Sequence, residues 1–259
     1  MHFDILTLFP QVITPYINES MMQRAIANGI ITVSAHNLRD WATDKHHITD
    51  DTPFGGGGGM VLKAEPVFSA VESMQDSAQP CPVILMSPQG QTLNHDLVEK
   101  LAKEKRLLIL CGRYEGVDER IREHLITEEI SIGDYVLSGG ELPALILIET
   151  VMRLLPGALG APNGASEDSF ADGLLEYPHY TRPAEFRGWQ VPDVLVSGNH
   201  KLVSRWRRKQ AWLRTLTRRP DLAVLTNPTK QDIELLKEIK MGDDPTLSDL
   251  IDTILRGKE

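Results

Sequence analysis

The chain has few cysteines, no basic N-terminal segment and no long apolar run, and each absence excludes a class of protein. Its two cysteines, Cys81 and Cys111, form no Cys-x-x-Cys pair, so we expect no thiolate zinc site and a reducing compartment. Asp4 comes early, which argues against a signal peptide. The apolar stretch from Leu142 to Ile148 is far too short to cross a bilayer. The sequence therefore predicts a cytoplasmic protein with no membrane partner.

Size and charge leave several function classes open. The 259 residues are 41% hydrophobic, enough to bury the core of one large domain or of two modest ones. A formal charge of -9 predicts that the chain as a whole is not drawn to polyanions. Basic residues nevertheless gather in one segment without a single acidic residue. Its basic members are Lys201, Arg205, Arg207, Arg208, Lys209, Arg214, Arg218 and Arg219.

This basic segment has the period of an amphipathic helix. At about 100° per residue, one stripe is apolar and is expected to pack on a core. The stripe consists of Leu202, Trp206, Leu213 and Leu216. Arg207, Arg214 and Arg218 fall on the opposite face, where they are expected to contact RNA or DNA phosphates, although a solvated basic helix is the alternative. Trp212 lies off the stripe, so it could stack on a base or pack between domains.

Strands and helices alternate through the first two-thirds of the chain. The expected strands are Phe3 to Leu8, Ile30 to Ser34, Val83 to Met86 and Leu107 to Cys111. The expected helices are Pro15 to Asn28, a helix capped by Asn94 that runs toward Glu104, and Glu141 to Leu155. This alternation predicts an α/β fold, a parallel sheet covered by helices.

Glycine-rich loops follow several of the expected strands. Ser87 to Gly90, Gly112 to Gly116 and Gly133 to Gly140 would converge beyond the carboxyl ends of a parallel sheet, where such folds bind small molecules. Glycine lets backbone groups approach a ligand closely, yet it is also common in ordinary turns. The run Gly55 to Gly59 lacks the Lys-Ser/Thr ending of a phosphate loop. Spacing alone leaves both interpretations of the loops open.

A polar segment poor in apolar periodicity, residues 157–173, reads as a mobile linker. It divides the chain into a sheet domain, residues 1–156, and a helical domain, residues 174–259. Within the linker, Glu167 and Asp168 could be brought to a substrate when the segment orders. An exposed acid without a catalytic role is the simpler interpretation.

Nine motifs in the same order make the chain resemble the bacterial tRNA (guanosine-37-N1)-methyltransferases over nearly its whole length. They are Ile5 to Pro10 (ILTLFP), Asp50 to Met60 (DDTPFGGGGGM), Ser87 to Gly90 (SPQG), Cys111 to Arg120 (CGRYEGVDER), Ser131 to Pro143, Glu167 to Leu175 (EDSFADGLL), Pro178 to Pro183 (PHYTRP), Val191 to His200 (VPDVLVSGNH) and Arg205 to Gln210 (RWRRKQ). The chain departs from the family at Gly58, where proline is common. Glycine at this position should loosen the loop and leave the family assignment unchanged.

The resemblance implies a fold and a cofactor site that periodicity could not have indicated. The fold is that of the SPOUT class, whose cofactor region is threaded into a deep trefoil knot, an exception to the usual rules of connection. The family acts as a homodimer with active sites between subunits and uses S-adenosylmethionine. Its motif places the cofactor at Pro88, Gln89, Gly90, Gly112, Tyr114, Glu115, Ile132, Gly133, Asp134, Tyr135, Val136, Leu137, Gly140 and Pro143.

The chemistry then needs a base, since N1 of guanine is protonated at neutral pH and cannot attack a methyl group until that proton leaves. The family motif puts this carboxylate at Asp168 and the cation that stabilises charge on O6 at Arg153. By the same resemblance, tRNA phosphates would contact the arginine face. Glu115 is a candidate for contact with the cofactor or with magnesium, which such enzymes are said to need.

Other interpretations stay open at the level of sequence. His46, His47, Asp50 and Asp51 are adjacent rather than paired at ligand spacing, so a polar loop near RNA is preferred over a metal site. A ribose 2′-O-methyltransferase of the same class would share the cofactor loops without needing Asp168. A non-catalytic RNA-binding protein would need only the basic helix.

Overall fold

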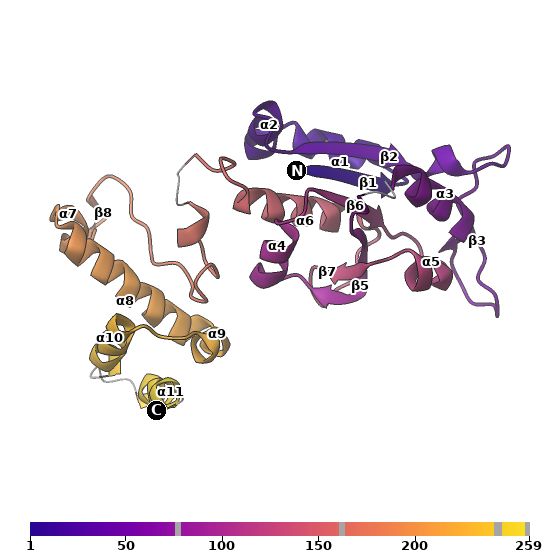
Figure 1. The fold of residues 1–259 in the computed structure, drawn as a ribbon. Coiled ribbons are helices and arrows are strands. Elements are labelled where there is room, and N and C mark those ends of the chain that lie inside the picture. Colours follow the sequence, from indigo (N-terminus) through magenta and orange to yellow (C-terminus); the bar gives the residue numbers. More distant parts are fainter. Residues whose placement is uncertain (76–78, 161–163, 241–244, 257–259) are drawn as a thin grey trace. The chain divides into compact units, whose positions relative to one another are not determined.

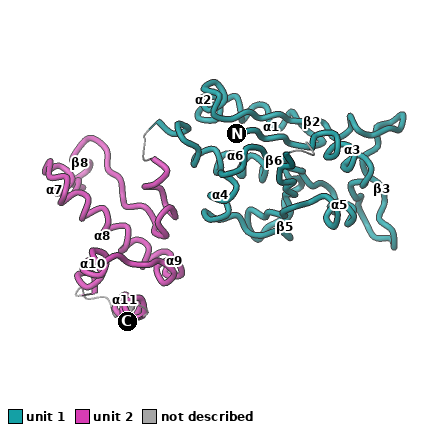
Figure 2. Tube along the Cα trace, in the orientation of Figure 1, with its two compact units in different colours: residues 1–162 teal, residues 163–259 magenta. Residues whose placement is uncertain are grey.

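The protein consists of two compact units, Met1–Pro162 and Asn163–Glu259 (Figure 2). The computed structural model describes residues 1–75, 79–160, 164–240 and 245–256 (Figure 1). Of the expected linker, residues 157–160 belong to the first unit and 164–173 to the second, while 161–163 lie outside the described residues. In the described part of the chain, no helix is both long and apolar enough to span a membrane.

The first unit is built on a five-stranded parallel sheet in the order β2-β1-β6-β5-β7 (Figure 1). The strands are β1 (His2–Thr7), β2 (Thr32–Asn37), β5 (Val83–Thr92), β6 (Arg106–Cys111) and β7 (Glu128–Ser131). Every neighbouring pair among them is parallel. The predicted α/β class is therefore confirmed. A two-stranded antiparallel pair, β3 (Asp50–Asp51) and β4 (Val61–Leu62), stands apart from the main sheet.

Side chains that alternate along the strands contribute to two separate hydrophobic cores, one on each face of the sheet. In β6, Leu107, Ile109 and Cys111 join one core, and Leu108 and Leu110 join the other. Since successive side chains of a strand point to opposite faces, this run has to be covered on both sides. The first core is completed by α1 (Pro10–Ile17), α2 (Ser20–Ala27), α4 (His95–Leu101) and α6 (Glu141–Leu154). The second is completed by the 3-10 helix η1 (Leu38–Trp41), α3 (Ala64–Met74) and α5 (Glu119–His124).

Local signals predicted some boundaries and missed others. Asn94 caps α4 as expected, its side chain accepting a hydrogen bond from the Leu97 N–H at 3.0 Å. The single helix expected from Pro15 to Asn28 is wrong, because the structure has two helices, α1 and α2, separated by a break. Pro10 lies in the first turn of α1, a position that suits proline, and Ser20 takes a positive φ of 50° where the chain turns into α2.

The second unit is helical and has its own core. Its helices are α7 (Asp193–Val196), α8 (His200–Arg218), α9 (Pro220–Leu225), α10 (Lys230–Lys240) and α11 (Pro245–Arg256), and a short hairpin pairs β8 (Glu185–Phe186) with β9 (Trp189–Gln190). The core includes Trp212, which is fully buried, and its indole Nε1 donates a hydrogen bond to Asp232 Oδ1 at 2.8 Å. Stacking of Trp212 on a base or between domains is therefore wrong.

The apolar stripe predicted for the basic helix is also shifted. In α8 the buried residues are Ala211, Trp212, Thr215 and Leu216, whereas Leu202 is 51% exposed. The prediction placed Leu202 and Trp206 in the core, but only the second half of α8 contacts that core. Trp206 is instead half-buried beside Tyr180, with 6.4 Å between the ring centroids.

Candidate functional site: a pocket at the carboxyl edge of the sheet

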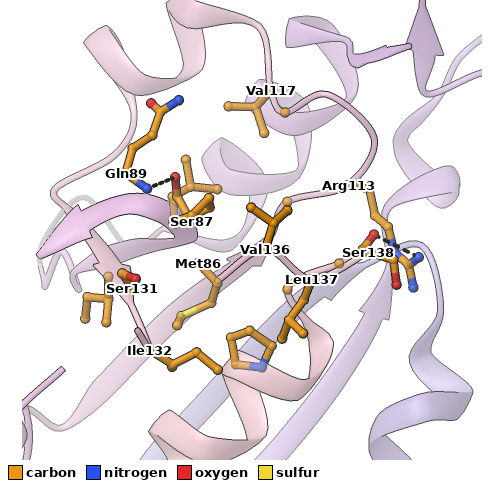
Figure 3. A pocket seen from close by; sticks show the side chains of 18 of the residues that line it. Met86, Ser87, Gln89, Arg113, Val117, Ser131, Ile132, Val136, Leu137 and Ser138 are labelled. Carbon is orange, nitrogen blue, oxygen red and sulfur yellow. Dashed lines mark hydrogen bonds between the residues drawn. The ribbon is translucent and has the colours of Figure 1, made fainter. Parts of the chain in front are cut away.

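Three loops leave the sheet at the same level and enclose a pocket (Figure 3). The register pairs Met86 of β5 with Cys111 of β6 on one side and with Ile130 of β7 on the other. Because the strands are parallel, the segments that follow these three residues meet at one edge, as the glycine-rich loops predicted. The pocket gathers most of the residues expected at the cofactor: Pro88, Gln89, Gly112, Tyr114, Glu115, Ile132, Gly133, Tyr135, Val136, Leu137, Gly140 and Pro143. Gly90 and Asp134 are not among its lining residues.

The first loop is a bulge within β5 rather than the end of the strand. Both Met86 and Gln91 pair with Ile130, so the four residues between them leave the ladder. The Gln89 N–H donates to Ser87 Oγ at 3.2 Å and closes the turn (Figure 3). Gly90 lies against the backbone of Glu129 and Ile130, where a Cβ would clash. Glycine is thus needed at position 90 for this loop to pack against the backbone of Glu129 and Ile130.

The second and third loops contact each other through their backbones. The Gly140 N–H donates to the Gly112 carbonyl at 2.9 Å, and Arg113 forms an isolated bridge with Gly139. A Cβ on Gly140 would lie 2.7 Å from the Cα of Cys111 and 3.0 Å from the Gly112 nitrogen. Neither backbone atom can give way as a flexible side chain would. The approach of these two loops therefore depends on glycine at position 140.

A buried ionic network holds these two loops, and sequence reasoning missed it. Arg113 pairs with Glu141 at 3.2 Å and donates to the Ser138 carbonyl at 3.1 Å (Figure 3). Glu141 is buried and accepts a hydrogen bond from Thr7 Oγ1 at 2.6 Å. The Arg113 guanidinium also lies 4.4 Å from the centre of the Phe9 ring. Positions 7, 113 and 141 are too far apart in the sequence for spacing to have linked them.

The lining combines apolar side chains with hydroxyl groups. Met86, Ile132, Val136 and Leu137 supply apolar surface, as Figure 3 shows, while Ser87 and Ser131 supply hydroxyl groups. Burial raises the pKa of the Cys111 thiol well above its usual value, and the charge of Glu141 adds to this, so the thiol beneath the pocket is neutral. Such a lining suits a small molecule with both apolar and hydrogen-bonding parts.

The β3–β4 hairpin reaches the rim of the pocket. The Glu115 N–H donates to the Met60 carbonyl at 3.0 Å, and Leu62 forms a parallel bridge with Val117. Burial and the nearby Asp50 raise the pKa of Tyr114, outweighing the opposite effect of Arg39. Asp50, which we expected in a polar loop, therefore lies beside Tyr114 of the second loop.

Asp168 lies in the second unit, on the edge of a separate hollow. It is half-buried directly after a 3-10 turn, Ala165–Glu167, and lines the hollow together with Arg207 and Arg208. The Tyr177 hydroxyl donates to Glu167 Oε2 at 3.1 Å, and the Arg207 guanidinium lies 4.8 Å from the centre of the Tyr177 ring. The structure thus brings Asp168 and Arg207 to the same hollow. Arg153 is half-buried in the last turn of α6 in the first unit, so its partnership with Asp168 stays a prediction.

Several cations of the basic helix form ion pairs that its sequence did not indicate. Four of its cations pair with acids from elsewhere in the unit: Arg205 and Lys209 with Glu238, Arg208 with Asp172 and Asp232, and Arg219 with Asp221. The segment itself contains no acidic residue, so all of these partners come from outside it. Of the expected tRNA contacts, Arg214 donates to the Glu176 carbonyl at 3.1 Å, Arg207 is half-buried and Arg218 is exposed.

Among the described residues, no group of three or more His, Cys, Asp or Glu side chains is arranged to hold a metal ion. Glu115 is exposed at the pocket rim, and a magnesium requirement stays a prediction.

The fold and the pocket define an α/β protein that has a pocket suited to a small molecule at the carboxyl edge of a parallel sheet and that also has a helical unit. The chain belongs to the family described as tRNA (Guanine-1)-methyltransferase TrmD, whose model matches residues 1–224.

Curated relatives agree with this assignment. A protein of Moorella thermoacetica is 56% identical over 242 residues, covering 92% of this chain and 96% of its own length. A Brevibacillus brevis protein is 54% identical over 240 residues, covering 93% and 98%. A Dehalococcoides mccartyi protein is 53% identical over 240 residues, covering 92% and 97%. All three are named tRNA (guanine-N(1)-)-methyltransferase.

Proposed function

We propose that the protein transfers a methyl group from S-adenosylmethionine to N1 of the guanosine at position 37 of tRNA. The observation that carries this proposal is the match of the family to residues 1–224, which include the pocket and the segment of Asp168. Proteins that are more than half identical over nearly the whole chain are named tRNA (guanine-N(1)-)-methyltransferase, which supports methyl transfer to N1 of a guanine in tRNA.

The pocket residues fit the cofactor. Gly90 and Gly140 let the loops pack closely against neighbouring backbone, and this packing would shape the pocket around a ligand. Leu137 and Pro143 offer apolar surface for an adenine ring, and Ser87 and Gln89 offer hydrogen-bonding groups. When bound, S-adenosylmethionine supplies an electrophilic methyl group. The Arg113–Glu141 pair would keep the two glycine loops at the spacing that the ligand needs.

Asp168 is the proposed general base. Its carboxylate would accept the N1 proton of guanine, which frees the N1 lone pair for attack. As the proton leaves, negative charge builds on O6, and the Arg153 guanidinium would stabilise it. These residues belong to different units, and in this proposal both act on the same base of the bound tRNA.

The knot and the dimer belong to this proposal as well. Family membership supports the proposals that the chain near the cofactor is threaded into a trefoil knot and that two subunits pair around each active site. Tyr16, Leu142 and Ile146 leave apolar surface exposed on α1 and α6, as a subunit interface requires. Phosphate contacts by Arg207, Arg214 and Arg218, and a need for magnesium, are likewise proposed.

A labelling experiment tests the function. The protein is incubated with methyl-labelled S-adenosylmethionine and a tRNA transcript whose guanosine 37 follows another guanosine. We expect label in this RNA and none in the same transcript carrying adenosine at position 37. Equal labelling of both transcripts, or of neither, would refute the proposal.

A further inference from the structure

The β8–β9 hairpin of the helical unit carries aromatic side chains that its core does not cover. Phe186 is 55% exposed and Trp189 is 70% exposed, and neither belongs to the core around Trp212. Every residue from Thr181 to Gln190 is exposed. Large aromatic side chains bury much of their surface in most folded proteins, so this hairpin presents surface suited to a partner.

The hairpin holds its rings in a defined arrangement. Phe186 and Trp189 face each other in the register, with 6.2 Å between their ring centroids. Arg187 and Gly188 form the two-residue turn with φ of 56° and 85°, the backbone that matches the twist of hairpin strands. Two hydrogen bonds close the base, from the Val191 N–H to the Ala184 carbonyl at 2.8 Å and from Gln190 Nε2 to Glu185 Oε2 at 2.7 Å. Little conformational entropy then has to be lost when the rings bind a partner.

A cation completes the surface. The Arg187 guanidinium lies 5.1 Å from the centre of the Phe186 ring, so a planar charged group and two rings are presented together. Arg182 is exposed nearby in the sequence, and Tyr180 is 50% exposed while its ring leans toward Trp206 of α8. The same short segment thus offers three exposed aromatic rings and two arginines. Unpaired nucleobases are held by this combination of aromatic faces and guanidinium planes.

We propose that Phe186, Arg187 and Trp189 form a stacking platform for an unpaired nucleobase of the RNA substrate. This inference rests on the proposed function. A guanine that presents N1 to the methyl donor has to leave its neighbours, and the base faces exposed by that step gain from a new stacking partner. A protein partner would favour an uninterrupted apolar surface, whereas here charged residues alternate with the rings.

Binding measurements on the intact protein test the platform. The variant Phe186→Ala/Trp189→Ala is titrated with the tRNA transcript at several salt concentrations, without S-adenosylmethionine. We expect tRNA affinity to fall about 10- to 100-fold, with the slope of affinity against salt unchanged because no phosphate contact is lost. Phe186→Tyr/Trp189→Phe should keep most of the affinity. Leu225→Ala, which removes a 79% exposed apolar side chain from the same unit, should bind like the original chain.

Four results would overturn the platform. The first is unchanged tRNA affinity in the double alanine variant, and the second is an equal loss in Leu225→Ala. A third is a change in oligomeric state on gel filtration with the loss of affinity, which would make the hairpin a contact between subunits. The fourth is weaker S-adenosylmethionine binding, which would mean that the cofactor loops were disturbed. Failure of the proposed function appears separately, as absence of methyl transfer by the unaltered protein.

Discussion

At the scale of single residues, the account depends most on Asp168. We predict that Asp168→Asn lowers kcat by about two to four orders of magnitude, since an amide cannot take the N1 proton. Steady-state kinetics with the guanosine-37 transcript measures this, and the KM for S-adenosylmethionine should stay within about twofold, because Asp168 is not in the cofactor pocket.

Glu167→Gln is the matched control for that variant. It alters a carboxylate one residue away, which hydrogen-bonds to Tyr177. Most activity should remain in it. An active Asp168→Asn protein, or a Glu167→Gln protein that is equally inactive, would assign the base to another group.

Gly140 tests the cofactor pocket. We predict that Gly140→Ala weakens S-adenosylmethionine binding tenfold or more, because its Cβ would meet the Cα of Cys111 at 2.7 Å and force the two loops apart. Isothermal titration calorimetry measures the change. In Gly58→Ala the new Cβ has no atom within 4 Å, so this control should bind normally. Equal affinities in the two variants would contradict the placement of the ligand.

The ionisation of the Asp4 carboxyl group makes the stability of the protein depend on pH. Burial pushes the pKa of Asp4 upward, but hydrogen bonds from His36 and Arg106, with help from His2, outweigh it and leave the pKa below its usual value. The folded carboxylate therefore stabilises the protein above the unfolded pKa of about 3.9, and this contribution is lost as pH falls through the folded pKa.

We predict that Asp4→Asn lowers the free energy of unfolding by about 2 kcal/mol at pH 7 and flattens its decline below pH 4. Urea unfolding at a series of pH values measures both effects. Glu104→Gln, an exposed change, should follow the original curve. A steep acid decline that persists in Asp4→Asn would assign that decline to other carboxyl groups.

At the scale of elements, α8 organises the second unit through its second half. Trp212 fills the core, and Asp232 of α10 accepts hydrogen bonds from Trp212, Arg208 and Thr229, which hold the pKa of Asp232 well below its usual value against the effect of burial. We predict that Trp212→Ala costs about 3–5 kcal/mol and unfolds this unit at lower temperature. Circular dichroism during heating measures it. Leu202→Ala, at an exposed position of the same helix, should cost less than about 1 kcal/mol, and equal losses would contradict the observed core.

Helices and strands could be predicted from the sequence where a local feature of the sequence determines them. The run Leu107 to Cys111 has to be buried on both faces, and Asn94 supplies a helix cap within its own turn. The stripe of α8 was misjudged because the helix is longer than the core it contacts. The bulge of β5 escaped prediction because it depends on pairing with Ile130, more than 35 residues away in the sequence.

In the candidate site, too, some features could be predicted from local sequence and others could not. Its glycine loops were found because glycine marks close backbone approach, and Gly90 and Gly140 do lie against neighbouring backbone. The Arg113–Glu141–Thr7 network was missed since only the fold brings these residues together. Asp168 was noticed as an acid on a polar linker, but its proposed role and the choice of Arg153 came from family resemblance, because no local pattern indicates a catalytic role for either residue.

At the scale of the whole molecule, the proposed function has both units act on one RNA. The pocket belongs to the first unit, and Asp168, the basic helix and the aromatic hairpin belong to the second. In the proposed function this division separates cofactor binding from base selection, so we expect that each can be disabled by a substitution that leaves the other intact. It also predicts that the position of the new methyl group depends on a residue outside the cofactor pocket.

The most direct test of this account is the identity of the methylated nucleoside. Guanosine-37 tRNA is methylated by the protein, digested to nucleosides and analysed by chromatography with mass spectrometry, with Asp168→Asn protein in parallel. The account predicts 1-methylguanosine from the unaltered chain and at most a trace from the variant. A 2′-O-methylated nucleoside, or 1-methylguanosine formed equally well by the variant, would contradict it.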